Sequence, residues 1–359
     1  MSRRVYPSEA IVHVDRLTGR AVRQVTTAEA IHHTPFFLVP AFDDALAWLF
    51  FVSTRTGRPE VFAEERASGR LVQLTDHADL NPWSMHPSHD GRYLYFTAGA
   101  TGHRVEMATL AIETVVAFEG DGLRGEGMVA AGMGTTSLSR CDRTWVMKGR
   151  RRGGAALIAV DTATGAARTV IERDTIAHVQ VCPDDPDLIF YAGPFKDRIW
   201  TARLDGSEHR SHVQRAPGQW ITHETWLPGR FELAFVDWPH GVRAVDVRNG
   251  AVRDLLHLNA WHASASRDGS RMVADTNHPD RGIVTFPTDG RGGHEVLCAA
   301  DSSNEGEHWR GPFPYEDGPI QVQARQHTHP HPTFAPDGSC VVFNSDRSGW
   351  AQVYEVGVT

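Results

Sequence analysis

The sequence predicts an all-β protein, a seven-bladed β-propeller closed by its N-terminal strand. Three observations lead to this prediction. Helical periodicity is scarce along the chain. Short runs of β-branched and aromatic residues alternate with turn residues, which is typical of all-β proteins. One pattern of turn and strand recurs seven times in the 359 residues.

The repeated pattern is a turn of Pro, Ser, Asp or Gly residues followed directly by an apolar strand. The seven predicted apolar strands span residues 46–52, 93–96, 145–147, 188–191, 233–236, 272–274 and 341–343. Most copies are spaced by roughly 40 to 50 residues, the length of a four-stranded propeller blade. The last interval is longer, so we expect an insertion at about residues 300–323, between blades six and seven. We therefore predict a single propeller domain over residues 1–359.

The two ends of the chain predict how the propeller closes. A strand at Ala351–Glu355 comes so near the C-terminus that the last blade lacks its fourth strand. The N-terminal piece, residues 11–15 and then 19–26, can supply that strand. Closure of this kind removes free sheet edges, so we expect the N-terminal strand to complete the last blade.

Composition excludes several classes of partner. Hydrophobic residues make up 41% and charged residues 22% of the chain, which is ordinary for a globular protein. A net charge of -8 predicts binding to neither nucleic acid nor an anionic membrane, both of which attract basic surfaces. The four cysteines are scattered, which favours reduced thiols over a disulfide framework or a cysteine zinc site. No secretory signal is recognisable at the N-terminus, so we expect a soluble cytoplasmic protein. The oligomeric state stays open.

The stretch Gln326–Pro332 concentrates three histidines and a glutamine in six positions. Alternate side chains of an extended chain face the same side. His327, His329 and His331 would then lie together, or only the last two if the chain bends earlier. Imidazoles beside a carboxamide indicate a metal site. A solvated histidine-rich loop is the alternative.

Histidines also stand at the entries to six of the seven predicted inner strands. These entries hold His32 and His33, His86, His178, His223, His262, and the histidines of Gln326–His331. Because the inner strands of a propeller surround one channel, we expect a shared pocket there. For any one of these residues taken alone, a hydrogen-bonded structural histidine is the alternative.

Several motifs together resemble known families. The Pro336-Asp337-Gly338 turn and the strand that follows it resemble the repeats of TolB-like propellers. The motifs around the histidines resemble the oligogalacturonate lyases, polysaccharide lyase family 22, in order and approximate spacing over roughly residues 30–359. They are Arg198-Ile199-Trp200, Thr222-His223-Glu224-x-Trp226, Trp261-His262 and Gln326-x-x-His329-Pro330-His331-Pro332.

This resemblance implies a set of roles. Enzymes of that family are seven-bladed propellers that bind a divalent metal, usually manganese, through three histidines and a glutamine. By position, the metal ligands here would be His262, Gln326, His329 and His331. The same matching makes His223 the general base and Arg198 the arginine beside it.

The chemistry of a uronate lyase is compatible with these roles. β-Elimination requires that the carboxylate be neutralised, that a base take the α proton, and that the developing negative charge be held. A bound cation serves the first and third needs. A neutral histidine can serve as the base, and an arginine can bind a carboxylate through two hydrogen bonds. Five further residues are candidates to bind substrate, namely His33, His86, His178, Gln180 and His278, the last within the stretch Asp275–Asp280.

Three functions are therefore weighed. The first is a metal-dependent lyase, with Mn²⁺ as the expected cofactor, that cleaves short uronic-acid oligosaccharides (oligogalacturonides) to give a 4,5-unsaturated uronate. The second is a related lyase that acts on a different uronoside, such as a glucuronate-containing disaccharide. The third is a TolB-like binding propeller without catalysis.

Overall fold

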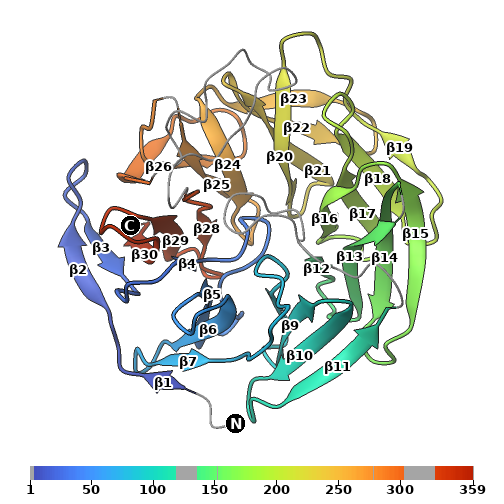
Figure 1. The fold of residues 1–359 in the computed structure, drawn as a ribbon. Coiled ribbons are helices and arrows are strands. Elements are labelled where there is room, and N and C mark those ends of the chain that lie inside the picture. Colours follow the sequence, from blue (N-terminus) through green and yellow to red (C-terminus); the bar gives the residue numbers. More distant parts are fainter. Residues whose placement is uncertain (1–3, 119–135, 152, 278, 303–327, 359) are drawn as a thin grey trace. The chain divides into compact units, whose positions relative to one another are not determined.

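Antiparallel β-strands form all the regular structure in the part of the chain that the computed structural model describes, residues 4–118, 136–151, 153–277, 279–302 and 328–358. They form seven sheets, which are the blades of a seven-bladed β-propeller (Figure 1). The predicted fold class is confirmed. Within these residues, nothing forms a helix long and apolar enough to cross a membrane. Most of the expected insertion at 300–323 lies outside the described residues.

The chain divides into two compact units. One consists of Met1–Ser8 and Leu38–His212, and the other of Glu9–Phe37 and Val213–Thr359. The single domain over residues 1–359 therefore stays a prediction.

The first unit holds the blades that come first along the sequence. Its strands are β1 (Val5–Tyr6), β5 (Trp48–Ser53), β6 (Glu60–Glu65), β7 (Leu71–Gln73), β8 (His86–Pro87), β9 (Tyr93–Ala98), β10 (Thr101–Glu106), β11 (Ile112–Ala117), β12 (Thr136–Leu138), β13 (Thr144–Arg151), β14 (Gly154–Asp161), β15 (Ala167–Arg173), β16 (Ala177–Val181), β17 (Leu188–Ala192), β18 (Ile199–Arg203) and β19 (Arg210–Ser211). The core lies between neighbouring blades. Phe50 and Val61 of one sheet pack with Leu94 and Phe96 of the next, all fully buried.

The second unit holds three blades. Its strands are β2 (Ile11–Val14), β3 (Ala21–Gln24), β4 (His32–His33), β20 (Trp220–Leu227), β21 (Glu232–Trp238), β22 (Gly241–Asp246), β23 (Val252–Leu256), β24 (Ala260–Ala265), β25 (Arg271–Thr276), β26 (Ile283–Pro287), β27 (Glu295–Cys298), β28 (Thr333–Phe334), β29 (Cys340–Ser345) and β30 (Gln352–Gly357). Two of its sheets follow chain order, β20 to β23 and β24 to β27. The third has the order β2-β3-β30-β29-β28.

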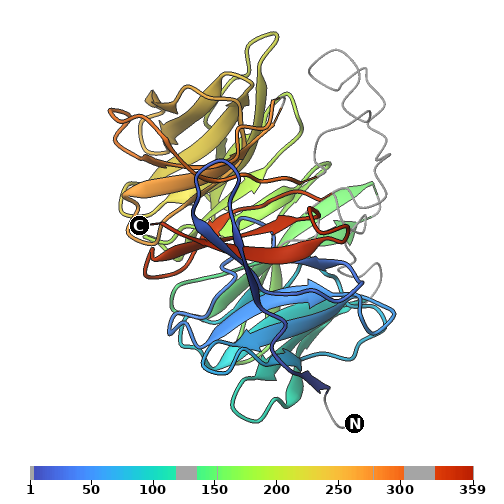
Figure 2. The ribbon, with the colours of Figure 1, turned by 90° about the vertical axis from the view of Figure 1, so that its left-hand side faces the viewer.

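The third sheet confirms the predicted closure by the N-terminus. β3 pairs antiparallel with β30, so that Val22 lies opposite Val356 and Gln24 opposite Tyr354. Figure 2 shows the dark-blue hairpin of β2 and β3 beside the red C-terminal strands. The sequence predicted one added strand, whereas β2 adds a fifth at the edge of the sheet.

The histidines lie on strands of their own, which corrects one prediction. The sequence placed them at the entries of the apolar strands, taken as the inner ones. Instead, the stretch before each turn forms a strand of its own, which pairs with the apolar strand that follows the turn. Four of these edge strands carry the histidines, in the order β8 with His86, β16 with His178, β20 with His223 and β24 with His262. In the second unit, β20 contacts β24, and β24 contacts β28. The histidines of successive blades are therefore neighbours.

Candidate metal and catalytic site

His262, His329 and His331 form a buried cluster in the second unit. One ring nitrogen from each residue lies within 4.8 Å of those of the other two. The ring centroid of His262 is 4.9 Å from that of His329 and 4.3 Å from that of His331. Three of the four predicted ligands are thus brought together. Gln326, the fourth, lies outside the described residues.

The donor atoms of this cluster fit a transition-metal ion. Nε2 of His262 lies 3.1 Å from Nδ1 of His329. Two imidazole nitrogens each about 2.1 Å from one ion, at about a right angle, are about 3 Å apart. Neutral imidazole nitrogens suit manganese, iron, nickel or zinc, and ligand type alone does not select among them.

Asp275 fixes the orientation of His262. Its Oδ1 accepts the backbone N–H of His262 at 2.6 Å, and its Oδ2 accepts Nδ1–H at 2.7 Å. With the proton on Nδ1, the lone pair of Nε2 points at the cluster. Asp275 is fully buried, and burial raises the pKa of its carboxyl to about 8, while the hydrogen bond from the His262 backbone acts to lower it.

Two side chains hold the segment that carries His329 and His331. Asn344 donates from Nδ2 to the carbonyl of His329 at 3.1 Å, and its backbone N–H donates to the carbonyl of Pro330 at 2.8 Å. Ser264 donates from Oγ to the carbonyl of Pro332 at 2.8 Å. Because proline offers no N–H, this segment is held through its carbonyl groups. Its two histidines therefore have fixed positions although they lie outside any strand.

β-Bulges and unusual backbone angles aim the histidines. The pairing register shifts between Thr222 and Thr225 in β20, and between Ala260 and Ala263 in β24. His223 and His262 lie within these two bulges. A bulge reorients its side chains relative to a regular strand. His223 and His331 also have positive φ angles, 53° and 46°, which non-glycine residues keep only where surrounding contacts impose them.

His223 lies beside the cluster of His262, His329 and His331 but is not part of it. Its ring centroid is 4.3 Å from that of His262. Its Nδ1–H donates to the carbonyl of Trp261 at 2.5 Å. Because this bond places the proton on Nδ1, Nε2 carries the basic lone pair of the ring, which is the tautomer that a general base requires.

Two phenylalanines wall this cluster, and the sequence analysis missed them. Phe37 is buried, with its ring 5.4 Å from His223, 5.2 Å from His262 and 5.9 Å from His331 between centroids. Phe36 lies edge-on to His331 at 4.8 Å. Apolar walls lower the local dielectric and strengthen charge interactions inside the site.

A family model described as oligogalacturonate lyase matches residues 9–359. The chain belongs to the oligogalacturonate lyase family. Among curated relatives, the oligogalacturonate lyase of Dickeya dadantii is 26% identical over 370 residues, covering 95% of this chain and 94% of the relative. The oligogalacturonide lyase of Pectobacterium atrosepticum is 24% identical, with 95% of this chain and 94% of the relative covered.

Solved structures agree on the fold. An oligogalacturonate lyase in complex with manganese superposes with a TM-score of 0.84 at 21% identity, covering 100% of this chain and 98% of that one. The oligogalacturonate lyase of Vibrio parahaemolyticus gives a TM-score of 0.82 at 21% identity, covering 100% and 99%.

The first unit of this family member carries Arg198, His178 and Gln180. Arg198 is half-buried just before β18, and its guanidinium donates from an Nη to Nδ1 of His178 at 3.3 Å. Gln180 donates from Nε2 to the carbonyl of His178 at 3.4 Å. His178 has a positive φ of 49° within a register shift between Ala177 and Gln180. The bulge of β20 thus has a counterpart in β16. The role of Arg198 beside His223 stays a prediction.

His33 and His86 share one arrangement. In each case Nδ1–H donates to the carbonyl of the next residue in the chain. His33 donates to Thr34 at 2.9 Å, and His86 donates to Pro87 at 2.8 Å. Burial lowers the pKa of His33 to about 4, and burial together with the nearby His89 lowers that of His86 to about 3. Both rings are therefore neutral at pH 7. Their role in substrate binding stays a prediction, and His278 lies outside the described residues.

Asp275 and Phe37 were not predicted as site residues, and the sequence patterns that could have identified them differ. Asp275 opens the stretch that supplied His278 as a candidate, but its contact with His262 depends on strand pairing between β24 and β25. Phe37 follows His32 and His33 by a few residues. Its position in the motif His-His-Thr-Pro-Phe-Phe was the available signal.

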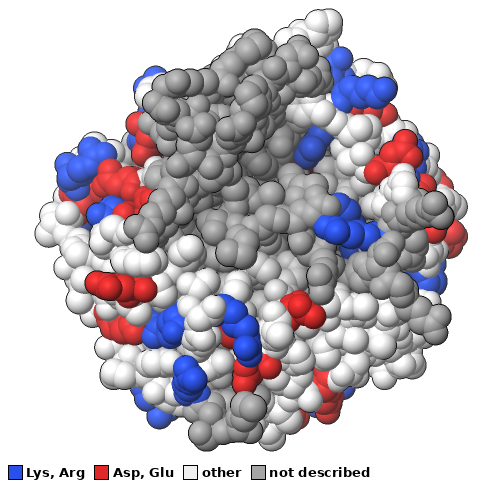
Figure 3. All heavy atoms as spheres, in the orientation of Figure 1, with Lys and Arg blue, Asp and Glu red and all other residues white. Residues whose placement is uncertain are grey.

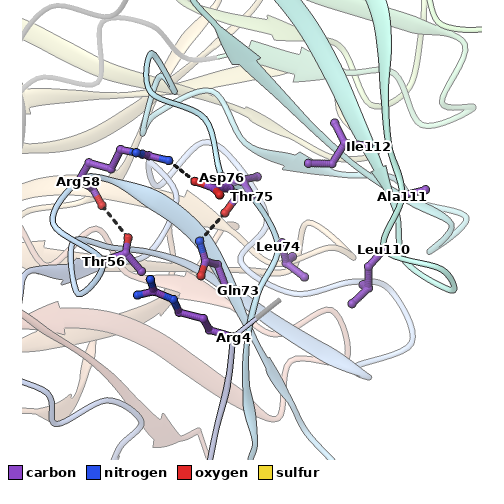
Figure 4. A pocket seen from close by; sticks show the side chains of 10 residues that line it. All are labelled: Arg4, Thr56, Arg58, Gln73, Leu74, Thr75, Asp76, Leu110, Ala111 and Ile112. Atoms are coloured by element: carbon purple, nitrogen blue, oxygen red, sulfur yellow. Dashed lines mark hydrogen bonds and ion pairs between the residues drawn. The ribbon is translucent and has the colours of Figure 1, made fainter. Parts of the chain in front are cut away.

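A cavity of about 560 Å³ lies in the first unit, apart from the histidine cluster described above (Figure 4). Arg4, Gln73 and Leu110 are among its lining residues. Gln73 donates to the carbonyl of Thr75 at 2.7 Å, and Arg58 donates to Asp76. None of the predicted ligands or catalytic residues that the structure describes is among its lining residues.

Surface charge is mixed on the face that Figure 3 presents, where basic and acidic side chains of described residues stand close together. Ion pairs among the described residues include Arg70 with Glu65 at 2.7 Å and Arg104 with Glu113 at 2.8 Å.

Proposed function

We propose that this protein is a metal-dependent lyase that cleaves short galacturonide oligosaccharides by β-elimination and leaves an unsaturated uronate. The observation that carries the proposal is the placement of His223. Its ring lies 4.3 Å from His262, one of three clustered histidines, yet its Nδ1–H is bound to Trp261. In this proposal, the base would thus stand directly beside the site for the cation.

His223 would take the α proton of the uronate. A carbon–carbon double bond forms as the bond from the β carbon to the glycosidic oxygen breaks, and that oxygen leaves with a proton from the His223 imidazolium or from water. Nε2 is the basic atom, because Nδ1 keeps its proton in the bond to the Trp261 carbonyl. That bond also stabilises the imidazolium that forms on proton transfer, since a charged donor strengthens a hydrogen bond. A positioned base of this kind contributes about 10²- to 10⁴-fold to a rate.

His262, His329 and His331 would hold the metal, with Gln326 as the fourth predicted ligand. When bound, a divalent cation supplies Lewis-acid neutralisation of the substrate carboxylate and of the charge that develops on it. Manganese is the metal we propose, since a structural relative was solved in complex with it. Asp275 would keep Nε2 of His262 directed at the ion, and Phe36 and Phe37 would exclude water from one side.

Arg198 would bind a substrate carboxylate. Because its guanidinium donates to Nδ1 of His178, that ring nitrogen acts as an acceptor and the ring is neutral. His178, Gln180, His33, His86 and His278 remain our candidates for further contacts with the sugar. These roles await substitution of each residue.

We further propose that the protein acts in the cytoplasm during pectin degradation, on oligomers small enough to be imported. The cysteines among the described residues, Cys141, Cys182, Cys298 and Cys340, form no disulfide with one another, which fits a reducing compartment. Fractionation of the source cells tests this location directly.

A substrate panel tests the reaction. The purified protein, supplied with manganese, is incubated with digalacturonate, trigalacturonate and a glucuronate-containing disaccharide. We expect ultraviolet absorbance of an unsaturated uronate from the galacturonides. Absorbance only from the glucuronate substrate would instead identify a lyase for another uronoside. No product from any of them, with no bound metal, would support a non-catalytic propeller.

A further inference from the structure

The outermost strand of the C-terminal blade, β2, is apolar and exposed. Relative exposure is 45% for Ile11, 67% for Val12 and 80% for Val14, and Leu17 in the following turn is 51% exposed. These are four of the seven exposed large hydrophobic residues in the described part of the chain. Exposed apolar groups on a free strand edge are typical of a surface that pairs with another chain.

Other outer edges of the described blades are protected, which makes β2 an exception. Proteins prevent edge pairing by placing charged residues or prolines on edge strands, or by keeping those strands very short. Each of the other outer edge strands of at least four residues carries charge: Glu113 in β11, Arg168, Glu172 and Arg173 in β15, Arg253 and Asp254 in β23, and Glu295 in β27. β2 is Ile-Val-His-Val, with neither a Lys, Arg, Asp or Glu nor a proline.

The backbone of β2 shows which groups face outward. Asp15 donates its N–H to the carbonyl of Arg20 at 2.8 Å and accepts the N–H of Gly19 at 2.9 Å. The backbone N–H and C=O groups of Asp15 therefore face β3. Because successive residues of a strand alternate in direction, His13 and Ile11 also face β3, while Val12 and Val14 direct their N–H and C=O groups away from it.

The pairing of β3 gives the same alternation independently. Val25 donates its N–H to Val353 at 2.8 Å, so residues 25 and 23 of the chain face β30. Val22 and Gln24 then face β2, where they lie opposite His13 and Ile11. The outward edge of β2 thus presents the polar backbone groups of Val12 and Val14.

We propose that β2 pairs antiparallel with β2 of a second copy of this chain about a two-fold axis. With His13 on the axis, Val12 lies opposite Val14 of the partner subunit, and Val14 lies opposite Val12 of the partner subunit. Both hydrogen-bonded pairs then fall inside the strand, and the backbone groups of four residues are satisfied. The exposed valine side chains, two residues apart, form one apolar row on the same face.

This arrangement is isologous, because the same patch serves both subunits and the contact closes on itself. No other chain is needed to satisfy the edge, and the strand is self-complementary in both hydrogen bonding and apolar character. The inference does not depend on the metal or on the reaction proposed above.

Light scattering coupled to size-exclusion chromatography of the full chain tests the proposal. We expect a species of twice the 39.7 kDa chain mass. Val14→Pro removes an N–H that points away from β3, so it leaves the β2–β3 pairing intact, and proline is tolerated on edge strands. Since each dimer loses two hydrogen bonds, the dimer dissociation constant should rise by about tenfold or more.

Two further variants complete the design. Val12→Lys places charge on the row without changing the backbone, and it should also give monomers. Val252→Lys on β23 is the matched control, since Val252 is an exposed valine of another outer edge, and it should stay dimeric. Melting temperature verifies folding of each variant. A monomeric wild-type protein, or folded Val14→Pro and Val12→Lys proteins with an unchanged dissociation constant, would overturn the proposal.

Discussion

Asp275 and His262 form a buried carboxylate–imidazole pair, with Oδ2 of the aspartate 2.7 Å from Nδ1 of the histidine. The same carboxylate also accepts the backbone N–H of His262. Both bonds are made within one blade, between β24 and β25. The blade therefore positions the histidine before any metal binds.

Asp275→Asn should weaken metal binding. Asparagine has one acceptor oxygen in place of two, so it can keep one of the two bonds but loses the acceptor that holds the Nδ1 proton. Loss of such a partner typically lowers metal affinity about 10- to 100-fold. Titration calorimetry with Mn²⁺ measures this effect apart from activity. Asp254→Asn, at a half-exposed site paired with Arg243, is the control and should bind metal normally.

His223→Asn should abolish catalysis and spare the metal. Asparagine can still donate to the Trp261 carbonyl, but it has no basic nitrogen. We expect kcat to fall about 10²- to 10⁴-fold, with Mn²⁺ affinity unchanged. Loss of metal along with activity would make His223 a ligand rather than the base.

Asn344→Ala should loosen the segment of His329 and His331. The side chain accepts the N–H of Thr34 at 2.8 Å and donates to His329, and it is almost fully buried. Leaving two buried groups unsatisfied should cost about 2–4 kcal/mol of unfolding free energy. Urea denaturation gives this value, and calorimetry should show weaker Mn²⁺ binding. Asn249→Ala, in an exposed turn, is expected to change neither.

Acidification should destabilise the fold through His86. Its folded pKa is about 3, whereas the ordinary value is 6.5. Below pH 6.5 the unfolded chain takes up a proton that the folded chain does not, so this contribution is present above 6.5 and lost as pH falls. Between pH 7 and 5 the loss should be about 2 kcal/mol for this residue.

Denaturation of His86→Asn at both pH values checks the sign and the size of this effect. The unfolding free energy of the variant should depend less steeply on pH, because about one proton fewer is taken up on unfolding. Asn249→Ala serves as the comparison, because it removes no titratable group and should leave the pH dependence as it is. An equal pH dependence in wild type and His86→Asn would contradict the assigned cause.

Much of the fold could be predicted because its signals are local. Turns such as Pro336-Asp337-Gly338 and the apolar strands after them mark each blade in the sequence. The pairing of β3 with β30 followed from a blade one strand short. The identity of the edge strands was missed, since bulges and short pairings hide the alternation of β16, β20 and β24.

The site was predictable only in part for the same reason. His329 and His331 are two residues apart, so the sequence alone predicts that they lie together, although His331 has a left-handed rather than an extended backbone conformation. Asp275 meets His262 only through strand pairing, and Phe37 reaches the cluster from a segment nearly 200 residues away in the chain from His223. Neither contact leaves a local pattern. The roles assigned to Gln326 and His278 stay predictions.

The central claim, a base beside a metal that together carry out elimination, is tested most directly by one titration. Protein stripped with a chelator is mixed with digalacturonate, and ultraviolet absorbance is followed as Mn²⁺ is added. We predict no product without metal, a rate that rises and saturates with Mn²⁺, and no recovery in His223→Asn. Full activity of the stripped protein, or no product at any metal concentration, would contradict the account.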